Sequence, residues 1–197
     1  MKFIGITGGV GAGKSEILSY IAQRKDSLVV YADEIAGRLM NEPGICRAQL
    51  QKTFSSEKIY DVNGNLDKNR IRTEIFSSEN KTKSLNDIVH PAVREEILKQ
   101  VQDAQKNVAI RFFFVEAALL IEDHYDEVCD ELWYIDADED VRRKRLIKSR
   151  GYQNEWIDNI LQKQLLRSAF MEKCKVMIDN NGALEDALSQ VDKLLQK

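Results

Sequence analysis

The sequence predicts an α/β fold with three layers, in which helices cover both faces of a five-stranded parallel sheet. Short apolar runs alternate with longer segments of helical periodicity, which is typical of this class. The runs are apolar on both faces, as in parallel strands that are covered on each side. The first run breaks into glycines just before a helical segment. The expected strands are residues 3–7, 27–31, 107–115, 131–136 and 175–179.

Composition indicates one globular domain, residues 1–197. The chain is 43% hydrophobic and 31% charged, which is typical of a protein with a sizeable core. Its net charge of −3 gives no general attraction to nucleic acid or anionic membranes, and no apolar stretch could span a bilayer. The cysteines match no zinc or disulfide pattern. We therefore expect a cytoplasmic monomer or weak homo-oligomer that binds neither nucleic acid nor membranes.

The stretch after the first strand has the spacing of a phosphate-binding loop. Gly8 is followed by four residues and then by Gly13-Lys14-Ser15, which is the P-loop pattern. Such a loop points backbone N–H groups at a polyphosphate, while the lysine reaches the β- and γ-phosphates and the serine hydroxyl can bind Mg²⁺. The third glycine is misplaced for a dinucleotide-binding turn. The residues expected to bind ATP are Gly9, Gly11, Ala12, Gly13, Lys14, Ser15, Glu16, Arg150 and Asn181.

Asp33 follows the second expected strand and is a candidate for catalysis. It can cap the helix that is expected over residues 34–40. It can also act as a general base that accepts the proton of an attacking hydroxyl, as the aspartate of a kinase does. The residues alone leave both interpretations open, because geometry decides between them.

Residues 38–106 separate the second strand from the third and are too many for a simple crossover. An insert at this place would hold the acceptor substrate of a P-loop phosphotransferase. Pro91 is expected at the first position of the insert's last helix. His90 precedes it and is either a capping or packed histidine or a substrate contact. The expected helices are 47–54, 68–76, 81–89 and 91–106.

A basic segment between the fourth and fifth strands predicts a lid at about 138–172. The basic run 142–150 is short and has no interleaved aromatic residues, which argues against a nucleic-acid groove. A lid that closes over the triphosphate would bring arginines to the transferring phosphoryl group. A helix over 155–173 is expected to return the chain to the body. The favoured phosphate contacts are Arg145 and Arg150, and the weaker candidates are Arg142 and Arg167.

Ligands of parallel sheets bind beyond the carboxyl ends of the strands, which directs attention to three further residues. Glu116 and Glu122 follow the third expected strand, and either carboxylate could help to hold a metal through water. Asn181 follows the fifth strand in an Asn-Asn-Gly turn. Such a turn needs no functional explanation, but its position makes it a neighbour for a nucleotide base. The last helix, expected over 184–195, has a structural pattern.

Several stretches carry a more specific pattern than the P-loop alone. They are residues 6–15, 32–36, 85–91, 119–122, 145–152, 164 and 178–182. Together they resemble the dephospho-CoA kinase family over almost the whole chain. The resemblance implies a P-loop kinase that transfers the γ-phosphoryl group of ATP, with Mg²⁺, to the ribose 3′-hydroxyl of dephospho-CoA. The product is coenzyme A, in the final step of its biosynthesis.

The resemblance also implies roles for single residues. Asp33 matches the family's catalytic base, and the 142–150 segment looks like the family's lid. The catalytic residues that we expect are Asp33, Lys14, Arg145 and Arg150. The residues expected to bind the acceptor are Asp33, His90 and Glu122. The metal ligand that we expect is Ser15, with Glu116 as a further candidate.

Two other functional classes remain open beside the dephospho-CoA kinase hypothesis. The chain could be another P-loop kinase, acting on a nucleoside monophosphate, a nucleoside or a shikimate-like acceptor. A non-catalytic nucleotide switch is less well supported, because the P-loop and Asp33 are intact. The chain departs from the family's pattern at Tyr31, Glu16, Ala118 and Cys174-Lys175, and none of these removes a residue that the mechanism requires.

Overall fold

The computed structural model describes residues 1–196. Its five strands form one sheet in the order β2-β3-β1-β4-β5, and the pairs β1–β3, β1–β4 and β4–β5 are parallel. The predicted α/β fold class is therefore confirmed. The strands are β1 (Lys2–Thr7), β2 (Ser27–Tyr31), β3 (Phe112–Glu116), β4 (Glu131–Asp136) and β5 (Val176–Asp179).

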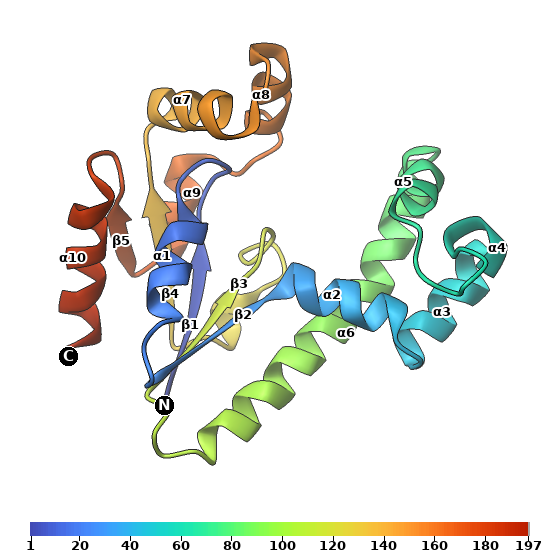
Figure 1. Ribbon diagram of the computed structural model, residues 1–197, viewed down its shortest axis with the longest axis horizontal. Coiled ribbons are helices and arrows are strands. Elements are labelled where there is room, and N and C mark those ends of the chain that lie inside the picture. The colour runs from blue at the N-terminus through green and yellow to red at the C-terminus, as the bar shows by residue number, and fades with distance from the viewer. Residues whose placement is uncertain (197) are drawn as a thin grey trace. The chain divides into compact units, whose positions relative to one another are not determined.

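The chain divides into two compact units, Met1–Val29 with Ala104–Lys197, and Val30–Asp103. The first unit holds most of the sheet, and α1 and α10 pack beside each other in it (Figure 1). Its helices are α1 (Lys14–Ile21), the short 3₁₀ helix η1 (Tyr125–Glu127), α7 (Glu139–Arg150), α8 (Asn154–Leu161), α9 (Arg167–Lys173) and α10 (Leu184–Leu195).

The second unit is almost entirely helical. Its helices are α2 (Ala32–Asn41), α3 (Ile45–Phe54), α4 (Ser56–Ile59), α5 (Lys68–Phe76) and α6 (Glu79–Gln105), the last of which ends just beyond the unit. Asp67 caps α5 by accepting hydrogen bonds from the backbone N–H groups of Asn69 and Arg70. Across residues 1–196, no helix combines the length and the apolar character that crossing a bilayer requires.

The core of the first unit explains why its strands are apolar on both faces. Ile4 and Ile6 of β1 are fully buried, as are Phe114 of β3 and Ile135 of β4. Burial of such side chains stabilises the fold by about 1.5–3 kcal/mol each. The sheet therefore fixes the end of β1, from which the P-loop continues.

The two helices predicted on either side of His90-Pro91 are one helix. α6 runs through Pro91 without a break, so the prediction that Pro91 opens a helix was wrong. An interior proline removes one backbone hydrogen bond and costs about 3 kcal/mol. Val89 and Val93, on either side of the proline, are both buried, and so is Ile97 one turn further on. Burial of one continuous apolar face thus outweighs the local penalty.

Two other boundaries differ from the prediction. β3 begins at Phe112 rather than at residue 107, because Asn107 forms a turn in which its side chain accepts from Ala109 N at 3.1 Å. The helix expected over 155–173 is interrupted between α8 and α9. The interruption has a tertiary cause, since the Phe170 ring of α9 stacks on Tyr134 of β4 with centroids 4.8 Å apart.

Candidate active site

Glycines shape the loop between β1 and α1. Gly11 (φ +83°) and Gly13 (φ +91°) have left-handed backbone conformations that favour glycine. A Cβ on Gly8 would lie 2.6 Å from the Ile135 carbonyl oxygen, and one on Gly9 would lie 2.5 Å from Cζ of Arg142. The loop can therefore lie directly against β4 and α7, with no side chain in between.

Lys14, the first residue of α1, lies at the centre of the loop. Its Nζ donates to the Gly8 carbonyl oxygen at 2.7 Å and lies 3.7 Å from Oε1 of Glu116, at the end of β3. Burial lowers the pKa of Lys14, and the charges of Arg142 and Arg150 lower it further, whereas Glu116 raises it. An anion in the loop would thus meet a partly desolvated ammonium group, whose attraction is stronger than in water.

Arg142 of α7 joins the predicted lid to the loop. Its Nε donates to the Val10 carbonyl oxygen at 3.0 Å, and its Nη2 donates to Oε1 of Gln164 at 2.7 Å. The same Gln164 oxygen accepts from Val10 N at 3.4 Å. The backbone N–H and C=O groups of Val10 are therefore both hydrogen-bonded to side chains of the segment between β4 and β5. The sequence ranked Arg142 below Arg145, but both contact the loop.

The other predicted lid arginines lie farther along the same segment. Arg145 is half-buried, and its Nη1 donates to the Ala12 carbonyl oxygen at 3.4 Å. Arg150, the last residue of α7, is exposed and lies over the Tyr152 ring, with Cζ 5.9 Å from the ring centroid. Contact of either arginine with phosphate stays a prediction.

Asn180, which the sequence analysis did not single out, lies against the loop. Its Nδ2 donates to the Ala12 carbonyl oxygen at 2.7 Å, and only 2% of the residue is exposed. The predicted residue Asn181 instead accepts from Asp138 N at 2.7 Å and donates to Asp179 Oδ1 at 2.7 Å. In the sequence, only the Asn-Asn-Gly turn after β5 pointed to this region. The turn does not show which of the two asparagines contacts the loop. Contact of Asn181 with nucleotide stays a prediction.

Arg167 has a protein partner in the carboxylate of Asp136. Its Nε lies 3.0 and 3.1 Å from the two carboxylate oxygens of Asp136, which is 1% exposed. The Arg167 hydrogen bonds lower the pKa of Asp136, and a hydrogen bond from Tyr134 acts in the same direction against the effect of burial. The pair fixes α9 to the end of β4, beside the Ile135 carbonyl that Gly8 approaches.

Ser15 and Glu16 lie in the first turn of α1, and both are exposed. They border a groove of about 390 Å³ between α1 and α10. The remaining residues that line it are Ser19, Tyr20, Gln23, Leu184 and Leu188. The exposed Glu16 carboxylate is thus solvated beside this groove rather than buried in the loop.

The residues predicted to bind the acceptor belong to both units. Asp33 is exposed in the first turn of α2, whose N-cap is Tyr31, so the helix-cap interpretation was wrong. His90 is half-buried in the interior of α6 and therefore caps no helix end. Both belong to the second unit, whereas Glu122 is exposed in the turn after β3 of the first. Their roles as acceptor contacts stay predictions.

Comparison with known proteins decides the family. A sequence model described as dephospho-CoA kinase matches residues 2–186. The chain belongs to the dephospho-CoA kinase family. A dephospho-CoA kinase of Fusobacterium nucleatum is 31% identical over 100% of this chain and 98% of its own length. One of Shouchella clausii is 32% identical over 98% of this chain and 97% of its own length.

Solved structures support the same fold. The structure of a dephospho-CoA kinase from Campylobacter jejuni matches with a TM-score of 0.72 and 22% identity, and it covers 100% of this chain and 96% of the other. The family model thus confirms the suspected family membership, and the structural match confirms the P-loop type of α/β fold.

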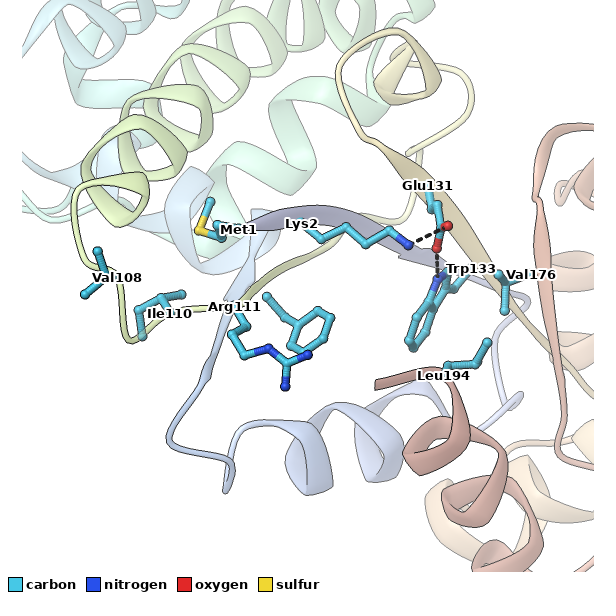
Figure 2. Close-up of a pocket in the computed structure, with 10 residues that line it drawn as sticks. Met1, Lys2, Val108, Ile110, Arg111, Glu131, Trp133, Val176 and Leu194 are labelled. Carbon is cyan, nitrogen blue, oxygen red and sulfur yellow. Dashed lines mark hydrogen bonds and ion pairs between the residues drawn. The ribbon is translucent and has the colours of Figure 1, made fainter. Parts of the chain in front are cut away.

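A cavity of about 520 Å³ lies outside the P-loop of this family member, at the amino ends of β1, β3 and β4. Figure 2 shows that Lys2 and Glu131 face each other there and that Glu131 also meets the indole of Trp133. The Glu131 oxygens accept from Lys2 at 2.6 Å and from Trp133 at 3.0 Å. Because these groups satisfy one another, we assign no chemistry to the cavity.

Proposed function

We propose that this chain transfers the γ-phosphoryl group of ATP to the ribose 3′-hydroxyl of dephospho-CoA, giving coenzyme A in the last step of its biosynthesis. Family membership supports the acceptor. One observation supports the donor, which is the Lys14 ammonium group held between the Gly8 carbonyl and the Glu116 carboxylate. Because ATP is the donor, we place the reaction in the cytoplasm.

The loop supplies binding and charge neutralisation. The first N–H groups of a helix have no acceptor within the helix, so those at the start of α1 are available to phosphate oxygens. On ATP binding, Lys14 would leave the contact with Gly8 O and meet the β- and γ-phosphates. Arg145 and Arg150 are the proposed lid contacts with the transferring group. Most of the rate enhancement would come from positioning and electrostatic stabilisation.

Ser15 and Glu116 fit a magnesium ion that arrives with ATP. Mg²⁺ prefers oxygen ligands and is usually held by one or two protein groups together with phosphates and water. The Glu116 carboxylate lies 3.7 Å from Nζ of Lys14, and Ser15 follows Lys14 in the first turn of α1, which supports the proposal that the two oxygen donors share one ion. When bound, the ion would neutralise charge on the β- and γ-phosphate oxygens.

Asp33 is the proposed general base. Its carboxylate is exposed on the first turn of α2, so it is available to a substrate hydroxyl. Accepting the hydroxyl proton would raise the nucleophilicity of the ribose oxygen as it attacks the γ-phosphorus. The second unit, which carries Asp33 and His90, is the proposed acceptor-binding part.

The acceptor is tested by coupled ADP release from MgATP. Dephospho-CoA is compared with AMP, CMP, a nucleoside, shikimate and no acceptor, each at the same concentration. We expect turnover with dephospho-CoA at least ten times above that with any other acceptor. Faster turnover with another acceptor would replace the proposed substrate but retain the P-loop kinase. Binding of ATP without turnover on any acceptor would favour the nucleotide switch.

A further inference from the structure

The hydrogen bond from Asn180 to the P-loop determines the orientation of one peptide group. The Ala12 carbonyl oxygen accepts from Asn180 Nδ2 at 2.7 Å and, more weakly, from Arg145 Nη1 at 3.4 Å. No peptide bond in the described chain is cis. In a planar trans peptide the C=O and N–H groups point in opposite directions. Holding the Ala12 carbonyl against Asn180 therefore directs the Gly13 N–H to the opposite side of the loop.

Asn180 is itself held in place by the sheet. Its backbone N–H donates to the Asp136 carbonyl oxygen at 2.8 Å, which continues the pairing of β5 with β4. The residue is 2% exposed, so its side chain has little room to move. A Cβ on Gly13 would collide with Nδ2 of Asn180. The Asn180 amide thus fills the space that a side chain at Gly13 would need.

The cost of burying this side chain argues against a role in packing alone. Its Oδ1 is buried and has no partner among residues 1–196. An unsatisfied buried polar atom costs about 1–3 kcal/mol, which an apolar side chain of the same size would avoid. The opposite orientation of the amide would set two carbonyl oxygens against each other. The hydrogen bond from Nδ2 to the Ala12 carbonyl oxygen therefore explains why this buried position holds an asparagine rather than an apolar residue.

We propose that Asn180 is a positioning residue of the phosphate site. Its amide holds the Ala12–Gly13 peptide so that the Gly13 N–H, at the N-cap of α1, points at a bound phosphate oxygen. The inference rests on the proposed function only in assigning the loop to a polyphosphate. It does not depend on the acceptor.

The test measures binding of MgATP and of magnesium tripolyphosphate by calorimetry, without acceptor. Tripolyphosphate carries the phosphate chain but no base or ribose. Asn180→Leu removes the donor without adding charge, and Asn180→Asp keeps the shape but loses the donor when ionised. Asn107→Asp, in the exposed turn before β3, adds the same charge away from the loop and serves as the control. Thermal unfolding of each variant confirms that it is folded.

We expect both Asn180 variants to bind both ligands roughly 10- to 100-fold more weakly than the wild type, the effect of losing one hydrogen bond from the Gly13 N–H to a charged phosphate oxygen. Protonation restores a donor in Asn180→Asp, so its affinity should recover as the pH falls, whereas that of Asn180→Leu should not. Unchanged affinity for tripolyphosphate in Asn180→Leu would overturn the proposal. If the same variant bound only ATP more weakly, Asn180 would contact the base rather than position the phosphate loop, which would also overturn the proposal. A wild-type chain that bound neither ligand would contradict the phosphate site itself, and hence the proposed function.

Discussion

Lys14 brings a positive charge into the phosphate site, and replacing it with alanine should lower ATP affinity roughly 10- to 100-fold. A hydrogen bond to a charged group contributes about 1.5–3 kcal/mol, which corresponds to that range. Because burial lowers the pKa of Lys14, wild-type ATP affinity should fall as the pH rises toward this lowered pKa, below the 10.5 of a free lysine. Calorimetric titration at several pH values measures both effects.

The control for this prediction is Lys25→Ala, which removes an exposed lysine that follows α1. It should bind ATP as the wild type does. Equal ATP affinity in Lys14→Ala and Lys25→Ala would exclude the role that we assign to the P-loop lysine.

Asp33 is the residue on which the proposed chemistry depends most. Asp33→Asn should lower kcat by about 10²–10⁴-fold, the usual effect of losing a positioned general base. ATP affinity should change little, because Asp33 has no role in our account of nucleotide binding. Steady-state kinetics with dephospho-CoA, beside a calorimetric ATP titration, separates the two quantities. Wild-type turnover in Asp33→Asn would rule out the base.

At the scale of elements, the Arg167–Asp136 pair should be important for stability because it joins α9 to β4. Arg167→Ala leaves the buried Asp136 carboxylate without its ion-pair partner, which is strongly destabilising. We expect the melting temperature to fall by several degrees, and the double variant Arg167→Ala with Asp136→Asn to recover most of the loss. Arg143→Ala, which breaks a pair whose carboxylate, that of Asp158, is far more exposed than that of Asp136, should have a much smaller effect. No recovery in the double variant would contradict this explanation.

The same pair has a defined pH dependence. The pKa of Asp136 is lower in the folded chain than in the unfolded one, because Arg167 stabilises the carboxylate. Its contribution to stability is therefore present above the unfolded pKa of about 3.9 and is lost as the pH falls through the folded value. Urea unfolding of the wild type and Arg167→Ala should converge in that acidic range.

Elements with a strong local signal were predicted from the sequence. The strands Ser27–Tyr31 and Glu131–Asp136 and the helix Leu184–Leu195 have the predicted bounds. The failures have tertiary causes, such as the continuous buried face of α6 across Pro91 and the stacking of Phe170 on Tyr134. Local preference is only a weak guide where such packing decides the backbone.

In the candidate site, too, features set by the local backbone were predicted from the sequence and features set by tertiary contacts were not. The glycine spacing revealed the loop, because the backbone conformation itself requires glycine at Gly11 and Gly13. Asn180 carried no such signal, since its importance comes from a contact with Ala12, 168 positions away in the sequence. The roles of Arg145, Arg150 and Asn181 were inferred from position, and ligand binding is needed to test them.

For the whole molecule, the division into two units predicts separate responses to the two substrates. Hydrogen exchange of backbone amides should slow with MgATP in segments 8–15 and 139–150 of the first unit. Dephospho-CoA should slow exchange within Val30–Asp103, the proposed acceptor part. Mass spectrometry of peptides after timed labelling measures both responses. Protection by dephospho-CoA confined to the first unit would contradict the assignment.

The central claim is that this chain phosphorylates the ribose 3′-hydroxyl of dephospho-CoA, and the most direct measurement is the structure of the product. The chain would be incubated with MgATP and dephospho-CoA, beside Lys14→Ala, and the products examined by ³¹P NMR and mass spectrometry. We predict one new phosphomonoester on the 3′-oxygen, formed together with one ADP, and far less of it with Lys14→Ala. Unchanged dephospho-CoA, or a phosphate at another position, would contradict the claim.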